Sequence, residues 1–524
     1  MAFVKNKNQQ ASMFNPIYGL TERETRILKK SWAHEFREVI FPAINEERFS
    51  VLYSENDATR PNTPVNIIIG TLLIKDMLGL TDEEMVEYVT FSTQGQYALH
   101  TESFTEQPIS DRTLSRFRER ALKYEIETGN DLIKEEIKSL ASVIKIKLDV
   151  TSKIQRIDSS MISAACRRLA RLSIMFLTVR GMAELIKSTG EANEYGDILA
   201  KYYKNDESDD ITYRVKGEEV RNKMAEVLAD AIMILESAGE KYGGTAEYGR
   251  LQRMVNDQSK PGDDGNRELK AGKEILPTSM QTPYDDECTY RQKAGTQNVG
   301  YVLNVVESYG ETANVIDDYD FQQNIYSDEQ FAEDVLNSKS DGGGETEIII
   351  TDGAYCSTTT LNIAEDKQID LAATSMAGGV LDDFVLGFTI DEETGKILEC
   401  PAGHKPNNSV YKNKTHIGYY RDWLCENCRY CDRCPGRFQK KLAKIEVTDA
   451  ALKKALYVRR RENDENLARY TKIRNGVENV FSVLKRRYQI NHIPVRGKLR
   501  KKMWTGFKIG AMNVMTLVNS RRNE

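Results

Sequence analysis

Three acidic residues, far apart in the chain, stand in contexts that could do chemistry together. Asp158 lies in the segment RIDSSMI, Asp352 in EIIITDGAY and Glu478 in RNGVENVFSVLK. The two aspartates stand at or near the end of apolar, β-branched runs, whereas the glutamate lies in a strongly helical stretch. If the folded core brings them together, three carboxylates form a site for two hard divalent cations, because Mg²⁺ prefers oxygen ligands.

The elements that must position these residues follow from the hydrophobic pattern. In segment 146–157 apolar residues alternate with polar ones, which predicts a strand that Asp158 follows directly. The apolar run 348–350 is typical of a central buried strand and places Asp352 at its carboxyl end, where ligands of open α/β sheets collect. A further strand is predicted over 300–308, and a long helical insertion is predicted after Asp158.

The third acidic residue lies on a helix face that also carries cations. Positions i, i+4, i+7 and i+11 of this face are Arg474, Glu478, Phe481 and Lys485. A carboxylate between two cations can bind a metal ion while the Arg and Lys side chains hold phosphates on either side. The alternative interpretation is an ordinary Arg–Glu pair on a solvated helix, which contributes little to stability.

Residues 20–140 have the pattern of a helical region. One helix is predicted to begin at Pro64 and to stop at Gly79, since proline suits the first turn of a helix and glycine the position after the last. Thr81, with Glu84 three residues later, is the capping-box pattern that opens the next helix. Short turns between helices are compatible with a helical DNA-binding module.

A third helix, predicted from Ser110, combines an apolar stripe with a basic surface. Its arginines include Arg112 and Arg116, which are the candidates for DNA contact in this region. Arginine is also a good helix former, so an ordinary surface helix is an equally good interpretation.

Charge is distributed unevenly along the chain. The net charge is −6, yet residues 435–524 hold 23 Lys and Arg against 7 Asp and Glu, a balance of +16. Such a surface suits a polyanion, because neutralisation of phosphates drives nucleic-acid affinity. The candidates for contact with the DNA backbone are Arg474, Lys485, Arg486, Arg487 and Arg496. Trp423 and Trp504 are expected in the core.

Eight cysteines are present, and four of them crowd into ten residues as Cys425, Cys428, Cys431 and Cys434. Thiolates at two-residue gaps predict a metal site in a reducing compartment rather than a disulfide framework. A closed tetrahedral zinc site is the first interpretation. An iron–sulfur cluster is the second, because the run nearly matches a bacterial ferredoxin spacing but has a last gap of two residues. Free buried thiols are the third.

The remaining cysteines and the apolar stretches add two expectations. Cys400 and His404 precede the crowded run, and Cys166, Cys288 and Cys356 look like ordinary structural residues. The longest apolar stretches fall well below the ~18 residues that a membrane helix requires, and the polar first residues predict no signal peptide. The expected location is therefore the cytoplasm.

Several of these segments, in this order, resemble those of bacterial insertion-sequence DDE transposases. The resemblance covers most of the chain and rests on GLTDEEMVEYV, PISDRTLSRFRER, IDSSMI, ITDGAY, CPAGH, ENVFSVLKRRYQINHIPVRGKLRKKMW and KIGAMN. The family's Glu lies in a signature of Tyr, two residues, Arg, three residues, Glu, six residues and Lys. Arg474, Glu478 and Lys485 fit this signature, but its tyrosine position falls on Thr471, one residue after Tyr470.

The resemblance implies a ribonuclease-H-like (retroviral-integrase-like) α/β core. Such a core cuts a strand at each end of a mobile element and then uses the freed 3′ hydroxyl to attack target DNA. The resemblance also implies catalytic roles for Asp158, Asp352 and Glu478 with two Mg²⁺ or Mn²⁺ ions, both of which Asp158 bridges. The implied partners are double-stranded DNA, at the terminal inverted repeats and at the target, and a second copy of the chain in a homodimer. The implied location is the bacterial nucleoid, with no membrane involved.

The expected organisation has four parts. They are a helical DNA-binding domain over 1–140, the first part of the core over 141–370 with a helical insertion at about 166–290, a cysteine-bearing insertion domain over 371–440, and the rest of the core with a basic tail over 441–524. Two other functions are compatible with the sequence. One is a transposase-derived DNA-binding protein that has lost catalysis, and the other is a metal-binding regulator associated with DNA.

Overall fold

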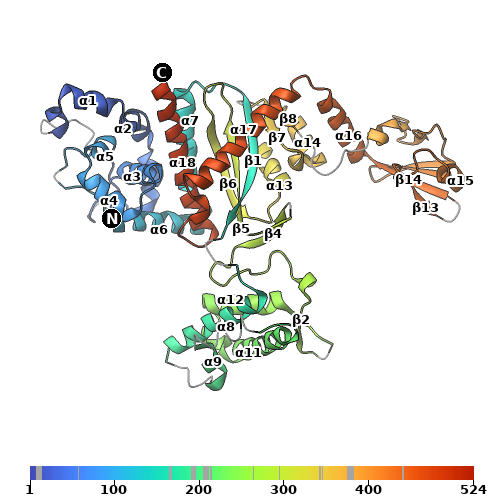
Figure 1. The fold of residues 1–524 in the computed structure, drawn as a ribbon, viewed down its shortest axis with the longest axis horizontal. Helices are drawn as coiled ribbons and strands as arrows, with labels where there is room; N and C mark the ends of the chain where they lie inside the picture. Colours follow the sequence, from blue (N-terminus) through green and yellow to red (C-terminus); the bar gives the residue numbers. More distant parts are fainter. Residues whose placement is uncertain are drawn as a thin grey trace.

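One mixed β-sheet lies at the centre of the computed structural model of the chain (Figure 1). The structure describes all residues except 8–14, 57, 105, 165–167, 191–195, 204–211, 213–214, 264, 294, 341–343, 345, 375–382, 440–441 and 524. The strand order is β4-β5-β1-β7-β8, with β6 also paired to β5. In chain order the strands are β1 (Ile154–Ser163), β4 (Thr289–Lys293), β5 (Thr296–Ser308), β6 (Val315–Gln323), β7 (Ile348–Thr351) and β8 (Asp370–Ala373).

The sheet combines antiparallel and parallel pairs. β1 runs antiparallel to β5 and parallel to β7, which is in turn parallel to β8. The prediction of an α/β core is confirmed, as are the strands predicted over 300–308 and 348–350. The helices that pack on this sheet are α7 (Leu132–Lys147), α13 (Asp328–Asn337), α14 (Thr358–Asp366), α17 (Leu467–Arg486) and α18 (Lys498–Asn523).

Alternation along the strands explains why both faces of the sheet are covered. Val305 of β5 packs in an apolar cluster with residues of α7 and α18, and the next residue, Val306, packs in a cluster with residues of α13 and α14. α17 lies on the same side as α7 and α18, where its Val477 and Val480 join their cluster. Both faces of the sheet are therefore buried, and its functional groups can reach solvent only at the strand ends and edges.

A helical region precedes the sheet. Its α-helices are α1 (Glu22–Lys29), α2 (Trp32–Glu35), α3 (Val65–Leu78), α4 (Asp82–Phe91), α5 (Thr93–Ala98) and α6 (Asp111–Thr128). The predicted stop of α3 is confirmed, since Gly79 has a φ of +73°, and so are the capping box of α4 and the start of α6 at Ser110, which caps this helix. The predicted start of α3 is off by one residue, because Pro64 is the cap and the helix begins at Val65.

The strand predicted over 146–157 is wrong in its first part. α7 continues to Lys147, because its buried residues recur at helical spacing, and Ile146 is 78% exposed. β1 begins only at Ile154 and continues past Asp158, so this aspartate lies inside the strand rather than after its end.

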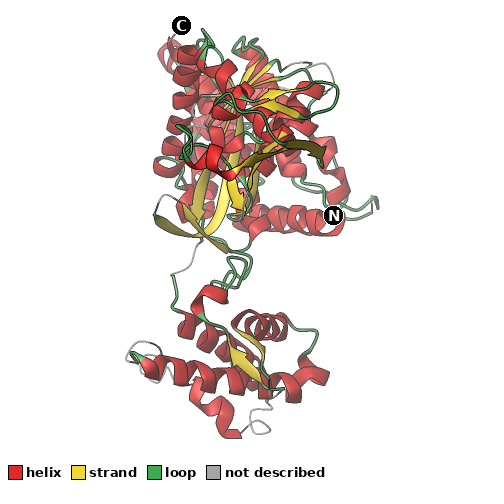
Figure 2. Cartoon of the chain, turned by 90° about the vertical axis from the view of Figure 1, so that its right-hand side faces the viewer, coloured by secondary structure: helices red, strands yellow, loops and turns green. Residues whose placement is uncertain are grey.

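The chain between β1 and β4 forms a helical insertion, which lies below the sheet in Figure 2. Its elements are α8 (Arg171–Ser188), α9 (Gly196–Tyr203), α11 (Glu218–Tyr242), α12 (Ala246–Gln258), β2 (Ser259–Pro261) and β3 (Arg267–Leu269). The buried apolar residues of these helices form a cluster of their own. The buried Asp285, at the end of the insertion, accepts hydrogen bonds from the Tyr301 hydroxyl of β5 and from the Gly497 backbone N–H.

A small sheet carries the cysteine segment at one end of the molecule (Figure 1). Its order is β11-β12-β14-β13, and a two-stranded ribbon of β9 and β10 precedes it. The elements are β9 (Thr389–Ile390), β10 (Ile397–Glu399), β11 (Asn408–Lys412), β12 (Thr415–Arg421), α15 (Asp422–Glu426), β13 (Arg437–Gln439), β14 (Leu442–Thr448) and α16 (Asp449–Glu462). Among the described helices, none is apolar over a long enough stretch to span a membrane.

Candidate active site

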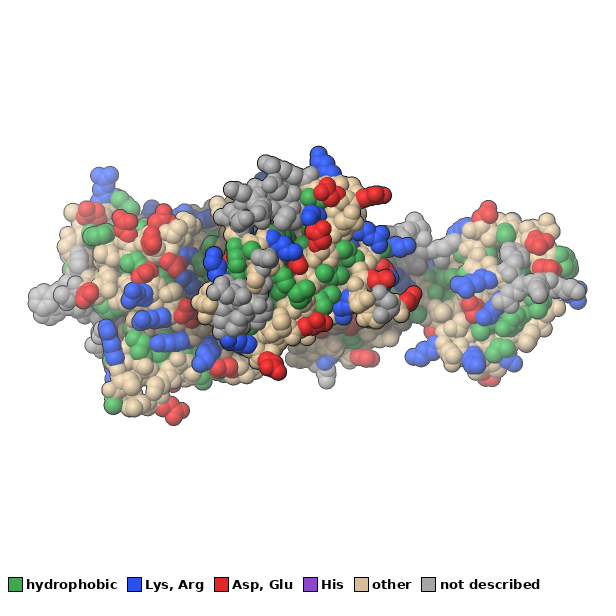
Figure 3. All heavy atoms as spheres, turned by 90° about the horizontal axis from the view of Figure 1, so that it is seen from below, with side chains coloured by type: hydrophobic (Ala, Val, Ile, Leu, Met, Phe, Trp, Pro, Cys, Tyr) green, Lys and Arg blue, Asp and Glu red, His purple; other side chains and the backbone are tan. Residues whose placement is uncertain are grey.

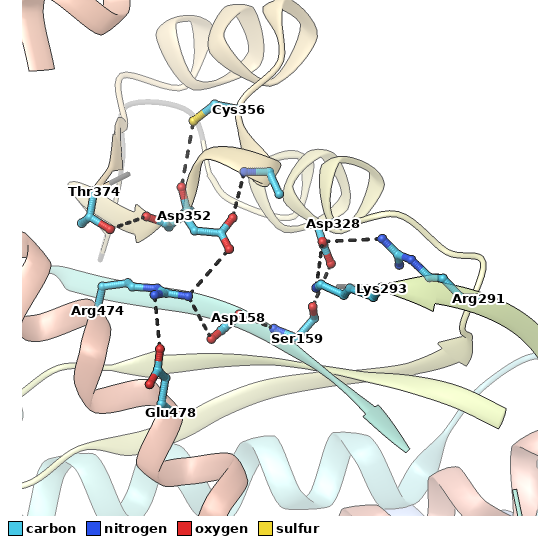
Figure 4. A network of polar contacts seen from close by, with 12 residues as sticks. Asp158, Ser159, Arg291, Lys293, Asp328, Asp352, Cys356, Thr374, Arg474 and Glu478 are labelled. Atoms are coloured by element: carbon cyan, nitrogen blue, oxygen red, sulfur yellow. Dashed lines mark hydrogen bonds and ion pairs between the residues drawn. The ribbon is translucent and has the colours of Figure 1, made fainter. Parts of the chain in front are cut away.

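Asp158, Asp352 and Glu478 meet around the guanidinium group of Arg474 (Figure 4). Arg474 Nη2 lies 3.7 Å from Oδ2 of Asp158 and 3.7 Å from Oδ2 of Asp352. Arg474 Nη1 lies 3.4 Å from Oε1 of Glu478. The structure thus brings three acidic residues to one cation from β1, from the end of β7 and from α17.

The parallel strand pair places the two aspartates. The pairing of β1 with β7 runs as far as Arg156 and Ile350. Asp158 and Asp352 each follow two residues later, so both lie at the carboxyl edge of the pair, where ligands of such sheets collect. Asp352 also caps a short 3₁₀ turn, and its Oδ1 accepts a hydrogen bond from the N–H of Ala354 at 2.8 Å. Its other oxygen faces Arg474.

A buried arginine holds α17 against β1. Arg156 is 3% exposed, forms an ion pair with Glu307 of β5, and donates a hydrogen bond from Nη1 to the backbone carbonyl of Ile473 at 2.5 Å. A Cβ at Gly476, nearly one turn further along α17, would clash with the same nitrogen, so glycine permits this close approach. The helix is thereby fixed at the position that brings its Arg–Glu pair to the aspartates.

Burial governs the charge of Asp158. The pKa of this carboxyl group is raised to about 6, chiefly by desolvation and to a smaller extent by the charge of Asp352. The hydrogen bond from the Ser159 N–H and the charges of Arg474 and Lys293 lower this pKa but do not cancel the effect of burial. A buried carboxylate beside a second carboxylate is stabilised by any cation that enters between them. The site is therefore electrostatically suited to a cation.

Replacing Asp158 by Asn should stabilise the metal-free protein above about pH 6 and leave its stability unchanged below about pH 4. The folded-state pKa of Asp158 is raised, so its charge destabilises the fold above that pKa, whereas below the ordinary aspartate pKa of 3.8 the group is protonated in both the folded and the unfolded state. The gain in the free energy of unfolding should grow from zero near pH 4 to about 1–3 kcal/mol near pH 6. Thermal unfolding in EDTA over this pH range measures it, and a less stable variant at neutral pH would contradict the expectation.

The donor chemistry of the site fits a hard divalent cation, because three carboxylates supply oxygen ligands. In the described part of the chain, no three His, Cys, Asp or Glu side chains are arranged to hold a metal ion as they stand. Here the guanidinium of Arg474 lies where the carboxylates converge and neutralises part of their charge. The arginine and a metal ion would therefore compete for the same oxygens.

The α17 residues at the lysine and tyrosine positions of the family signature have different surroundings. Lys485 points at β1, where its Nζ donates a hydrogen bond to Oγ of Ser160 at 2.6 Å, and burial lowers the pKa of this lysine. Tyr470 is buried in an apolar cluster with Ile350 of β7. The Thr471 hydroxyl donates to a backbone carbonyl of its own helix. The lysine of the signature thus contacts the strand that carries Asp158, while Tyr470 packs in the core.

Three further predicted arginines lie beyond the site. Arg486 and Arg487 are exposed at the end of α17. Arg496 is exposed in the loop before α18, with its guanidinium 5.1 Å from the centre of the Tyr284 ring. These residues offer positive charge to solvent but do not contribute to the group around Arg474.

A second basic region lies on the N-terminal helices. The exposed Arg112 and Arg116 line a pocket of about 580 Å³ at the start of α6. Arg120 lines the same pocket, as does Arg60 from the loop before α3, which sequence analysis did not single out. No local spacing could have grouped Arg60 with the others, because the two segments meet only in the folded chain.

The two tryptophans expected in the core differ in their surroundings. Trp423 of α15 is 56% exposed, so the expectation is wrong for this residue. Trp504 of α18 is partly buried near two cations, with Lys75 Nζ 4.4 Å and Arg118 Cζ 4.9 Å from the ring centre. Arg118 is also paired with Asp82 and is thus less available to a ligand than its neighbours on α6.

The cysteine run folds around one small pocket of about 30 Å³. Its lining includes Cys400, His404, Cys425, Cys428, Cys431 and Cys434. Burial and the neighbouring thiols raise the pKa of Cys425 to about 11. Outside this group, Cys288 and Cys356 are buried, as expected of structural residues, and Cys166 lies outside the described residues.

Two family models match the sequence. One, described as Transposase DDE domain, matches residues 399–518, which include the cysteine run and Glu478. The other, described as Transposase domain (DUF772), matches residues 22–120 in the N-terminal helices. Comparisons with curated proteins and with solved structures found no match.

Proposed function

The chain belongs to the DDE transposases of insertion sequences, and we propose that it cuts DNA at the ends of a mobile element and joins the freed ends to target DNA. Membership of this family implies DNA as the partner. The observation that carries the proposal is the convergence of Asp158, Asp352 and Glu478 on one point at the carboxyl edge of the sheet. Because two element ends must be processed together, we expect a homodimer on DNA, by analogy with other transposition systems.

We assign the central sheet and its helices to a ribonuclease-H-like core. The assignment is supported by the strand order β6-β5-β1-β7-β8, in which the first three strands are antiparallel and the last three parallel. It is also supported by the connections, since α13 lies between β6 and β7 and α14 between β7 and β8. In this assignment α17 supplies the third carboxylate from outside the sheet.

In the proposed reaction, Asp158, Asp352 and Glu478 would hold two Mg²⁺ or Mn²⁺ ions. Such ions supply Lewis-acid stabilisation of the charge that develops on the phosphate oxygens. If a metal ion took over these carboxylates, the guanidinium of Arg474 would be available to pair with a phosphate of the bound DNA strand. Lys485, which donates a hydrogen bond to Ser160 of β1, would contact the bound DNA strand near Asp158.

Two basic regions are proposed to bind DNA outside the site. The pocket lined by Arg60, Arg112, Arg116 and Arg120 would contact the DNA backbone at the element ends. Seen from below, Lys and Arg side chains gather on the face of the N-terminal helices (Figure 3). The exposed arginines at the end of α17 and before α18 would extend the contact along the duplex.

We also propose that the cysteine pocket holds Zn²⁺. Five thiols and one imidazole line it, and its small volume suits one ion. The side chains are not yet arranged as ligands, so binding would have to draw them together. Metal analysis of the purified protein should find one zinc per chain, lost when Cys428 and Cys431 are both replaced by Ser. Iron with visible absorption, or no metal and no uptake of added zinc, would contradict this proposal.

The proposed function is tested with a short duplex made from the DNA that flanks the coding region, including any inverted repeat there. With Mg²⁺ the protein should create 3′ hydroxyl ends at the repeat boundary and join them to a target plasmid; with EDTA it should do neither. An inactive relative would bind the duplex under both conditions and never cut it. A metal-dependent regulator would bind only with metal and leave the strands intact.

A further inference from the structure

A second group of charges lies beside Asp158, on the side away from Arg474 (Figure 4). The hydroxyl of Ser159, the next residue of β1, donates a hydrogen bond to Oδ1 of Asp328 at 2.8 Å. Asp328 lies in the first turn of α13, and its side chain is 7% exposed. Oδ2 of the same carboxylate is 3.5 Å from Lys293 Nζ, and also lies near the guanidinium of Arg291. Two cations of β4 are thus anchored next to the catalytic strand.

The two cations are held differently. Arg291 Nη1 donates hydrogen bonds to the backbone carbonyls of Asn324 at 3.2 Å and Tyr326 at 3.1 Å, and Nη2 lies 3.7 Å from Asp328. This arginine therefore ties β4 to the turn before α13 and balances the buried carboxylate. The Lys293 side chain is 47% exposed, and among the described residues its ammonium group is paired with Asp328. Arg291 and Lys293 together outweigh the single negative charge of Asp328. The excess positive charge is accessible to solvent on Lys293.

Asp328 of α13 brings this lysine close to β1, although β5 separates β4 from β1 in the sheet, and the edge of β1 that faces β7 is open at the site. The pairing of β1 with β7 ends at Arg156, so at Asp158 and Ser159 the strand has no neighbour on that side among the described strands. The positive charge of Lys293 stabilises the Asp158 carboxylate and so lowers its pKa. A strand of DNA that lies over the carboxylates would therefore have Arg474 on one side of the cutting point and Lys293 on the other (Figure 4).

We propose that Lys293, steadied by Asp328, binds a backbone phosphate of the DNA strand on the side of the cut opposite to Arg474. This proposal rests on the proposed function, since it names a second contact for the same bound strand. A phosphate contact adds affinity without sequence preference, because the backbone is the same at every base. The lysine would thus help to fix the strand in register over the carboxylates.

The test compares Lys293→Ala with Lys293→Arg, which keeps the charge, and with Lys260→Ala. Lys260 is an exposed lysine of β2 in the helical insertion, paired only with Glu274 among its described salt bridges. Binding of the flanking-DNA duplex is measured from about 50 to about 200 mM salt, a range over which phosphate contacts change affinity strongly. Lys293→Ala should lower the slope of log Kd against log salt by about 0.9, the value for one lost phosphate contact in duplex DNA. Lys293→Arg and Lys260→Ala should keep the wild-type slope.

A second readout locates the phosphate. In a series of duplexes, one phosphate near the cut is replaced by a neutral methylphosphonate, at a different position in each duplex. At one position this replacement should weaken binding by the wild-type protein but not binding by Lys293→Ala. An unchanged salt slope in Lys293→Ala, or the same methylphosphonate profile in both proteins, would overturn the proposal. Both readouts measure binding, so they remain valid if the protein fails to cut DNA, and failure of the proposed function is thereby distinguished from failure of this inference.

Discussion

Replacing Asp352 by Asn should abolish strand cleavage while binding of the flanking-DNA duplex keeps its wild-type affinity. Asn retains the oxygen that accepts the Ala354 N–H, so the turn after β7 should persist. It lacks the negative charge that faces Arg474 and that would hold metal. We expect the cleavage rate to fall by about a thousandfold, at the upper end of what the loss of one electrostatic group costs in other active sites.

The matched control for this substitution is Asp366→Asn. Asp366 is exposed at the end of α14, the helix that follows the turn of Asp352, and should tolerate the change with full cleavage activity. Cleavage is followed on end-labelled duplex with Mg²⁺ and with Mn²⁺, and binding is measured in EDTA. If Asp352→Asn still cuts at more than a small fraction of the wild-type rate, Asp352 is not part of the catalytic site.

Replacing Arg474 by Gln should change metal binding and cleavage in opposite directions. The guanidinium lies among the carboxylates that would hold metal, so its removal ends the competition. We expect Mn²⁺ to bind about tenfold more tightly, since a hydrogen bond to a charged group contributes about 1.5 kcal/mol or more. Cleavage at saturating Mn²⁺ should nevertheless fall by about a hundredfold, because the contact from Arg474 to phosphate is lost.

Arg469→Gln controls for the loss of a positive charge on the same helix. Arg469 is exposed on α17 and lies more than one turn before the site. Calorimetric titration with Mn²⁺ and the cleavage assay are run on both variants. Weaker or unchanged Mn²⁺ binding by Arg474→Gln would show that the arginine does not occupy the position of a metal ion.

Sequence patterns predicted the parts of the site that local spacing controls. The apolar run before Asp352 placed this residue at a strand end, and the helical spacing of Arg474, Glu478 and Lys485 placed them on one helix. The apolar run before Asp158 also placed this residue on or near a strand, but the pattern predicted the wrong strand limits. Alternation over a few residues cannot separate the last turn of an amphipathic helix from a half-buried strand, and burial in the folded chain decided for the helix.

The contacts that hold the site together could not be predicted from the sequence. Arg156 and the carbonyl of Ile473 are 317 positions apart, and their hydrogen bond depends on α17 crossing β1. Ser159 and Asp328 are 169 positions apart, and nothing in their local segments marks them as partners. Such pairs depend on tertiary packing, which neither periodicity nor spacing describes.

The most direct test of the account is anomalous X-ray diffraction from crystals of the protein grown with Mn²⁺. We expect Mn²⁺ bound by Asp158 and Asp352, with Glu478 beside it and the Arg474 side chain turned away from the carboxylates. Crystals with Mn²⁺ bound only elsewhere, while the protein cuts DNA in the same buffer, would contradict it.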